Sequence, residues 1–232
     1  MKRILIAGAF ALAAGGQALA ADLPQPYPAP YIPPPVPVFT WTGVYLGVNG
    51  GYAFGDSNWS APGLGSTGNF STDGGLFGGT VGANYQWGAF VLGIEADADW
   101  ANLSGSSSSI PAGCNVFACQ TQSGWLATVR GRAGYAFDRV LVYGTGGAAF
   151  GDIAASSGFL PWNSTSQVGW TAGAGIEWAF LPNWTAKVEY LYVDLGSQTC
   201  NFANCGGPPT TVTLTENIVR AGVNFKFGGW GW

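Results

Sequence analysis

The feature that most constrains this chain is an alternation of polar and apolar residues that recurs in eight segments. The clearest example is FVLGIEADADW, in which Glu95, Asp97 and Asp99 alternate with apolar residues. Successive side chains of a β-strand point to opposite faces, so each segment predicts a strand with one polar and one apolar face. The segments are Trp41–Phe54, Gly75–Trp87, Phe90–Trp100, Gly124–Phe137, Val140–Phe150, Val168–Trp178, Trp184–Tyr192 and Thr213–Phe227.

The connections between these segments alternate strictly between long and short. Outer-membrane barrels sort their connections in this way, with short turns on the periplasmic side and long loops outside, whereas a soluble meander has no reason to do so. The sequence therefore predicts an all-β fold, an eight-stranded antiparallel up-and-down transmembrane β-barrel with short periplasmic turns and four long extracellular loops. The expected loops include Ser57–Ser71, Leu103–Thr121, Ile153–Ser166 and Gly196–Thr210.

Every charged residue within the eight segments lies opposite the apolar face. A water-soluble barrel would carry charges outside on every strand, but the first, second and fifth segments have none, and only 9% of the chain is charged. Lipid explains this pattern, because an Arg or Lys that faces the bilayer midplane costs about 2–4 kcal/mol. We therefore expect the apolar face to contact lipid. The expected lumenal charge network comprises Glu95, Asp97, Asp99, Arg130, Arg132, Glu177, Lys187, Glu189, Glu216, Arg220 and Lys226.

The interior of such a barrel is expected to be filled, because eight strands enclose a space just wide enough for side chains. If Trp100 and Trp125 face each other, the same register places Glu95 opposite Arg130. The acidic residues of the third segment are expected to pair with Arg130 and Arg132, since an unpaired buried charge costs several kcal/mol. An exchange of the signs of Glu95 and Arg130 is expected to keep their pair. A polar core that holds shape is favoured over conduction.

The N-terminus of the chain predicts export. Lys2 and Arg3 precede an apolar run, and Ala18-Leu19-Ala20 resembles a cleavage site, so residues 1–20 are expected to be a signal peptide for the Sec pathway. Residues 21–39 form a Pro-rich stretch, which predicts an extended periplasmic arm. The barrel is expected to occupy residues 40–227, followed by a short tail at 228–232.

Several functions are disfavoured by what the sequence lacks. The chain contains no histidine, so a Ser–His–Asp arrangement is impossible, and pairing with arginine accounts for the closely spaced carboxylates. We expect no enzymatic activity, no catalytic residue, no metal and no cofactor. Without Lys2 and Arg3, six basic residues remain against twelve acidic ones, so no nucleic acid is expected as a partner.

The four cysteines form two pairs with the same C-x4-C spacing, in CNVFAC and CNFANC. In an oxidising compartment this spacing predicts two local disulfides, Cys114–Cys119 and Cys200–Cys205. A four-cysteine metal site is the alternative, which is disfavoured because the pairs lie in loops of different hairpins.

Several stretches resemble a known family, among them FTWTGVYLGVNGGYAFG, GTVGANYQWGAFVLGIEADADW, VRGRAGYAFDRVLVYGTGGAAFG, VEYLYVDLG and NIVRAGVNFKF. They are similar to the small outer-membrane β-barrel (porin-like) family of alphaproteobacteria, with the architecture of the OmpA-type membrane domain, from Phe39 to Phe227. The resemblance implies a barrel in the outer membrane of a Gram-negative cell, generally without enzymatic activity. Its partners would be outer-membrane lipids, lipopolysaccharide and the barrel assembly machinery. That machinery reads a terminal aromatic residue, here Phe227 or Trp232.

Two classes of function remain. One is a structural and interaction protein that contributes to the envelope and presents surface loops. The other is a small porin or a ligand-binding barrel, which passes small solutes or captures a hydrophobic ligand such as haem. The sequence leaves the surface ligand and the formation of a homo-oligomer open.

Overall fold

The computed structural model describes residues 39–63, 65–107, 119–157, 162–200 and 209–227. The predicted signal peptide, nearly all of the Pro-rich arm and the C-terminal tail lie outside these residues. No helix long and apolar enough to cross a membrane occurs in the described part of the chain. The strands are β1 (Gly43–Ala61), β2 (Gly65–Trp87), β3 (Phe90–Ser107), β4 (Cys119–Phe137), β5 (Val140–Ser157), β6 (Asn163–Leu181), β7 (Trp184–Cys200) and β8 (Thr210–Phe227).

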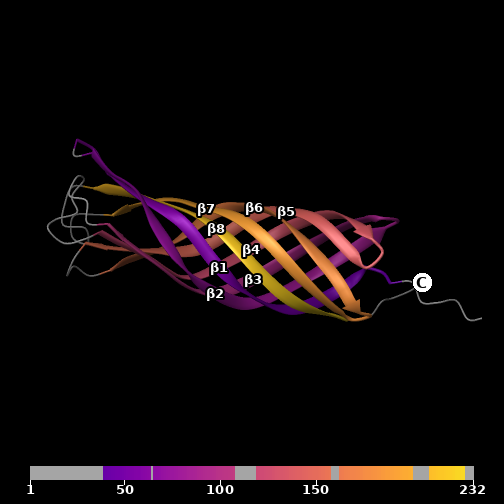
Figure 1. The fold of residues 1–232 in the computed structure, drawn as a ribbon. Helices are drawn as coiled ribbons and strands as arrows, with labels where there is room; N and C mark the ends of the chain where they lie inside the picture. Colours follow the sequence, from indigo (N-terminus) through magenta and orange to yellow (C-terminus); the bar gives the residue numbers. More distant parts are fainter. Residues whose placement is uncertain (1–38, 64, 108–118, 158–161, 201–208, 228–232) are drawn as a thin grey trace, which may run out of the picture. The chain divides into compact units, whose positions relative to one another are not determined.

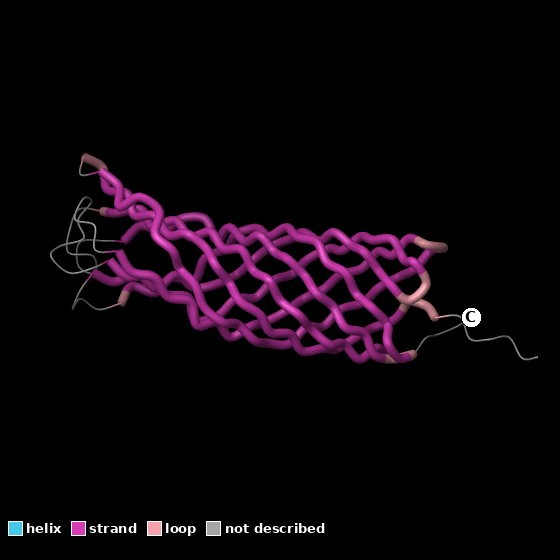
Figure 2. Tube along the Cα trace, viewed as in Figure 1, coloured by secondary structure: helices cyan, strands magenta, loops and turns pink. Residues whose placement is uncertain are grey.

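These strands close into one antiparallel barrel (Figure 1). Each strand pairs with the next along the chain, and β8 pairs with β1, which confirms the predicted fold class. Figure 2 shows short turns at one end of the barrel, which we call the turn end, and we call the opposite end the loop end. The register of β3 and β4 places Trp100 opposite Trp125 and Glu95 opposite Arg130, as the sequence predicts.

The strands are longer than the sequence pattern indicates. They contain 17 to 23 residues, whereas about 9–11 suffice to cross a bilayer. Most of the first predicted loop, Ser57–Ser71, is strand: β1 ends at Ala61 and β2 begins at Gly65. The other three predicted loops likewise begin too early and end too late. The prediction was wrong there because the outward residues become Ser, Asn and Thr, which are typical of loops.

On the turn side, the barrel is apolar outside and polar inside. Outward side chains such as Ile94 and Val129 are 68% and 57% exposed, which suits contact with lipid. Aromatic side chains border this band, as expected at the two membrane interfaces. At the turn end they include Trp87, Phe90, Phe137, Trp178 and Phe227, and toward the loop end Phe77, Trp100, Trp125 and Trp170. We call this part the membrane section.

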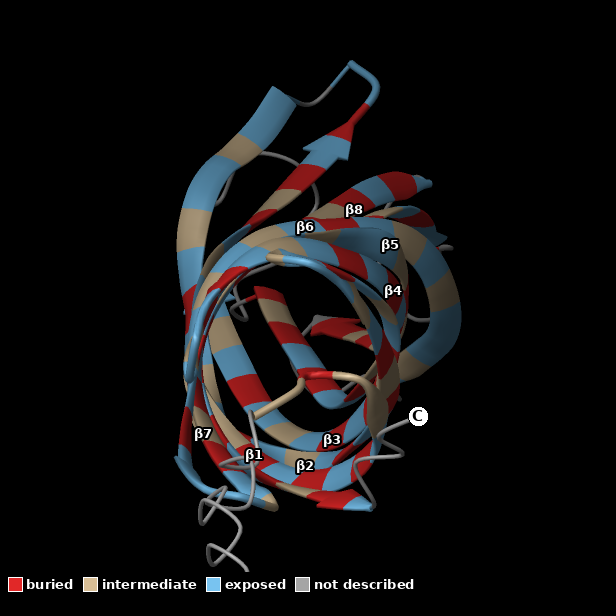
Figure 3. Cartoon of the chain, turned by 90° about the vertical axis from the view of Figure 1, so that its right-hand side faces the viewer, coloured by how far each residue is buried: buried red, intermediate tan, exposed pale blue. Residues whose placement is uncertain are grey.

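Beyond Phe77, Trp100, Trp125 and Trp170, the strands continue with reversed polarity, and we call this part the outer section. Buried and exposed residues alternate along the strands in both sections (Figure 3). In the outer section, however, the outward side chains are mainly those of Ser, Thr, Asn, Gln and Asp. An apolar core fills the inside and includes Trp59, Leu76, Leu103, Leu126, Ile153, Leu195, Val212 and Leu214. The outer section therefore has the polarity of a water-soluble barrel.

The segment that precedes β1 closes the turn end. The ring of Trp41 is 1% exposed and belongs to a small apolar cluster inside the barrel. Its Nε1 donates a hydrogen bond to the Asp138 carbonyl over 3.1 Å, and its backbone N–H donates to Gln86 Oε1 over 2.7 Å. Lys226 Nζ donates to the carbonyl of Thr40. Because these contacts join the segment to β2, to the turn between β4 and β5 and to the last strand, the segment acts as a plug.

Candidate functional site

The main cluster of buried charged side chains among the described residues lies inside the membrane section. All eleven charged residues singled out in the sequence are buried there or at its ends, with exposures of 1–6%. Among the described residues, nine N–O contacts of 2.5–3.3 Å join four basic and five acidic side chains into one network. Its members are Arg130, Arg132, Lys187, Arg220, Glu95, Asp97, Asp99, Glu177 and Glu189.

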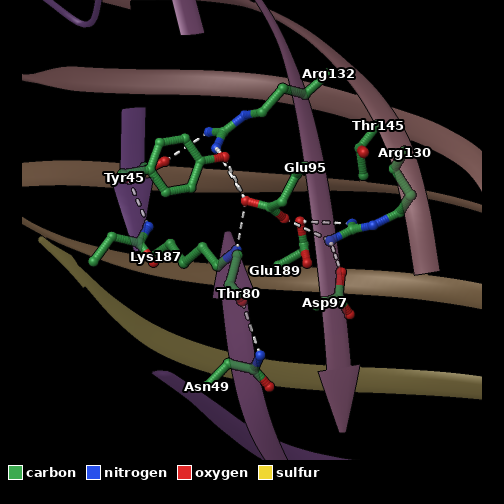
Figure 4. Close-up of polar contacts among 12 residues, drawn as sticks. Tyr45, Asn49, Thr80, Glu95, Asp97, Arg130, Arg132, Thr145, Lys187 and Glu189 are labelled. Atoms are coloured by element: carbon green, nitrogen blue, oxygen red, sulfur yellow. Dashed lines mark hydrogen bonds and ion pairs between the residues drawn. The ribbon is translucent and has the colours of Figure 1, made fainter. Parts of the chain in front are cut away.

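Arg130 on β4 connects three carboxylates (Figure 4). Its guanidinium lies 2.5 Å from Glu95, 2.9 Å from Asp97 and 3.0 Å from Glu189. Thr128, two residues earlier on the same inward face, accepts a hydrogen bond from Arg130 Nε and donates one to Asp97. Because the side chain of Arg130 is fully buried, these contacts replace its hydration.

Arg220 on β8 forms a second centre. It lies 2.6 Å from Asp97, 2.9 Å from Asp99 and 2.8 Å from Glu189. The expectation that Asp99 pairs with Arg130 or Arg132 was therefore wrong. Side chains inside a narrow barrel reach across the lumen, so β8 supplies a partner that neighbouring-strand register does not reveal.

Arg132 and Lys187 complete the network toward the turn end. Arg132 lies 2.6 Å from Glu177 and 3.3 Å from Glu95, and Lys187 lies 2.9 Å from the same Glu95 oxygen. The guanidinium of Arg132 also stacks over the ring of Tyr143, 4.0 Å from its centroid. Glu95 thus contacts three cations.

Neutral side chains that the sequence analysis did not single out donate further hydrogen bonds to the network. Tyr45 donates to Glu95 over 2.7 Å, and Tyr143 donates to Glu189 over 3.0 Å. Thr185 and Asn224 both donate to Glu177 Oε1, over 2.5 and 3.0 Å. Each lies on the inward face of its strand, so strand parity could have identified them.

Two of the predicted members, Glu216 and Lys226, lie outside the network. Lys226 is at the turn end, where its ammonium lies 4.2 Å from the centroid of the Phe39 ring. Glu216 is inside the barrel at the edge of the outer section, and its Oε1 has no hydrogen-bond partner among the described residues. Their inward parity is as the sequence indicates, but their height along the barrel separates them from the other nine.

The remaining predicted residues concern disulfides and assembly. Cys119 and Cys200 are each disulfide-bonded, whereas Cys114 and Cys205 lie outside the described residues, so the pairing stays a prediction. Phe227 ends β8 and is 52% exposed, and Trp232 lies outside the described part. Within that part, no cluster of three or more His, Cys, Asp or Glu side chains is arranged to hold a metal ion. Because every network carboxylate contacts a cation, the arrangement is suited to stabilising the lumen.

Comparison with known proteins shows which family this chain resembles. A family model described as the outer membrane protein beta-barrel domain matches residues 8–227. The chain is 36% identical to the 31 kDa outer-membrane immunogenic protein of Brucella melitensis over 98% of this chain and 100% of that protein. It is 33% identical to the 22 kDa outer membrane protein of Rhizobium leguminosarum over 84% of this chain and 82% of that protein.

A solved structure supports the same fold. The outer membrane protein OprG from Pseudomonas aeruginosa aligns with a TM-score of 0.52 and 13% identity, covering 80% of this chain and 97% of that chain. The family resemblance seen in the sequence is confirmed by the Brucella and Rhizobium relatives, and the location is the outer membrane of a Gram-negative cell. The chain belongs to the outer-membrane protein β-barrel domain family.

Proposed function

We propose that this outer-membrane barrel is a non-conducting envelope protein that stabilises the membrane and carries surface-exposed connections. The observation that carries the proposal is the filled lumen. The charge network occupies the membrane section, with side-chain exposures of 0–3%. An apolar core lies above it, and Trp41 closes the turn end below it. An open aqueous path would require displacement of all three layers.

The outer section supports the second part of the proposal. Its strands continue beyond the aromatic border with a polar outer face, which suits a position in water above the membrane. The described loop ends of the strands would therefore lie in water, away from the bilayer. The Brucella relatives are named immunogenic proteins, and exposed connections of this kind would be accessible to binding partners.

We also propose that the protein has no enzymatic activity and no cofactor. The absence of histidine removes the commonest general base. The clustered carboxylates are already engaged by arginine and lysine, which leaves none of the network acids poised to act on a substrate. For assembly, we propose that Phe227, the last residue of β8, is read by the barrel assembly machinery.

The experiment compares cells with and without the protein. Loss of an envelope protein should increase sensitivity to bile salts and large antibiotics, while uptake of small solutes stays unchanged. Restoring the intact chain should reverse the sensitivity. A deletion that lowers solute uptake and leaves the envelope intact would instead support the porin alternative.

A further inference from the structure

The outer section of the barrel is divided into two sheets. The ladder between β2 and β3 ends at the pair of Asp73 and Ser104, and the ladder between β6 and β7 ends at the pair of Trp170 and Asp194. The other ladders continue close to the ends of the strands. Toward the loop end, β3, β4, β5 and β6 therefore form one sheet, and β7, β8, β1 and β2 form another. Each sheet has two edge strands.

The edge of β6 is long and regular. Residues 163–168 pair with β5 without a register shift, and no described residue pairs with them on the opposite side of the strand. The free side of an edge strand presents the N–H and C=O groups of every second residue, which is about three residues in this segment. These groups can form a ladder with an added strand. We call residues 163–168 the β6 edge.

The other three edges of the outer section are protected or short. On β2, Gly68 has a positive φ of 69°, and on β7 the register shifts between Asp194 and Ser197, where Gly196 has a φ of 73°. On β3, the edge beyond Ser104 consists of residues 105–107. Bulges, charges and prolines keep edge strands from pairing with other chains. The β6 edge, with the sequence NSTSQV, contains no charged residue, Pro or Gly, so it is the best suited of the four to strand addition.

A second copy of this chain does not fit the β6 edge. The strands of outer-membrane barrels tilt by about 35–45° from the membrane normal. Two copies in one membrane are related by an axis along this normal, so their β6 strands would lean in opposite directions where they meet. The strands would cross at about 70–90°, which is twice the tilt, whereas neighbouring strands of a sheet differ by only about 20–25°. A segment of a different polypeptide has no such restriction.

The charges beside the β6 edge narrow the class of partner. Asp152 on β5 lies opposite Ser166, and Asp194 lies where the β6–β7 ladder ends. The described residues of the outer section include no Lys or Arg. These carboxylates would repel an acidic segment and attract a basic one.

We propose that the β6 edge binds an extended, basic segment of another polypeptide, which adds a fifth strand to the sheet of β3, β4, β5 and β6. The main-chain hydrogen bonds of the ladder would hold the segment, and the carboxylates would select its charge. The inference rests on the proposed position of the outer section in water, and it does not depend on the filled lumen.

The test uses the full mature chain folded in detergent micelles and a short synthetic peptide of alternating threonine and valine with lysines at both ends. Amide hydrogen exchange is followed by NMR. In the free chain, every second amide of residues 163–168 should exchange fast. Saturating peptide should slow the exchange of these amides by about tenfold or more and leave residues 211–213 unchanged. A peptide whose internal amides are all N-methylated cannot donate the ladder hydrogen bonds and should not bind.

Two variants and a second peptide test the role of charge. Ser166→Lys places a positive charge on the β6 edge and should weaken binding of the lysine-flanked peptide about fivefold. Thr211→Lys, at an exposed position of β8 in the interior of the other sheet, is the matched control and should bind as the unaltered chain does. A peptide flanked by glutamates should bind more weakly than the one flanked by lysines.

Several results would overturn the proposal. Slow exchange of all the amides of the β6 edge in the free chain would show that the edge is already covered. Protection that rises with protein concentration without peptide would indicate a second copy. Equal binding of the N-methylated peptide would exclude a ladder, and equal weakening by Thr211→Lys or equal binding of the glutamate-flanked peptide would contradict the assigned site and charge. None of these results concerns conduction, so the proposed non-conducting function is tested separately.

Discussion

Replacing Arg220 by Met should destabilise the folded barrel strongly. The side chain of Arg220 is fully buried and contacts Asp97, Asp99 and Glu189 at 2.6–2.9 Å. After the substitution, Asp97 and Glu189 keep contacts with Arg130. Asp99 keeps no cation among the described residues. Removing one partner of a buried ion pair costs about 3–5 kcal/mol, and this range is expected here because a carboxylate is left unpaired.

Arg130→Met provides an internal comparison. It also removes three ion pairs, but each partner keeps another cation: Glu95 keeps Lys187 and Arg132, and Asp97 and Glu189 keep Arg220. The loss of folding free energy should therefore lie at the lower end of the same range, about 3 kcal/mol. Arg220→Met should be the more damaging change, although the two arginines have equal numbers of ionic partners.

A double-mutant cycle tests the cause directly. Adding Asp99→Asn to Arg220→Met removes the stranded charge and should recover part of the stability, with a coupling energy of about 1–3 kcal/mol. Urea unfolding in detergent micelles, followed by tryptophan fluorescence and by gel mobility before and after boiling, measures each variant. If Arg220→Met unfolds at the same urea concentration as the unaltered chain, or if the two changes are additive, the ionic account of the lumen is wrong.

Three further predictions concern other parts of the barrel. Val129→Arg, on the lipid face, should cost about 2–4 kcal/mol of folding free energy in vesicles. Ser104→Arg, in the outer section, should change the folding free energy by no more than about 0.5 kcal/mol. Equal costs would show that the membrane boundary does not lie between these two residues. Trp41→Ala should lower stability by about 3–5 kcal/mol in the same urea assay, and an unchanged midpoint would show that the plug is not packed. Mass spectrometry of a non-reduced digest should find the pairs Cys114–Cys119 and Cys200–Cys205, and a bridge between the two pairs would refute local pairing.

Much of the barrel could be predicted because the alternation of polar and apolar residues shows which side chains of each strand face the lumen. The inward position of Glu95 and its register with Arg130 both follow from alternation and from the Trp100–Trp125 pair. The outer section was missed for a physical reason. Strand parity continues there, but inward residues such as Val212 are apolar and outward ones such as Thr211 are polar, so a criterion based on lipid-facing apolar residues no longer recognises the strand.

Contacts across the lumen could also not be predicted from the sequence. The pairing of Asp99 with Arg220 joins β3 to β8, which are not neighbours in the sheet. The expected charge exchange between Glu95 and Arg130 is likewise revised. An arginine at position 95 would lie against Arg132 and Lys187, so the exchange should not restore stability. Which side chains meet across the lumen depends on the diameter of the barrel and on the length of the side chains. Alternation along one strand and register between neighbouring strands do not show this.

Single-channel recording in planar lipid bilayers tests the central claim, that the lumen is filled, most directly. The purified, refolded protein should insert without producing steady ohmic currents, because ion pairs, an apolar core and Trp41 block the path at three heights. Only preparations that migrate as folded barrels on gels are used, so that an absence of current cannot result from a failure to fold. Stable, uniform openings from such a preparation would contradict the account and would support a porin.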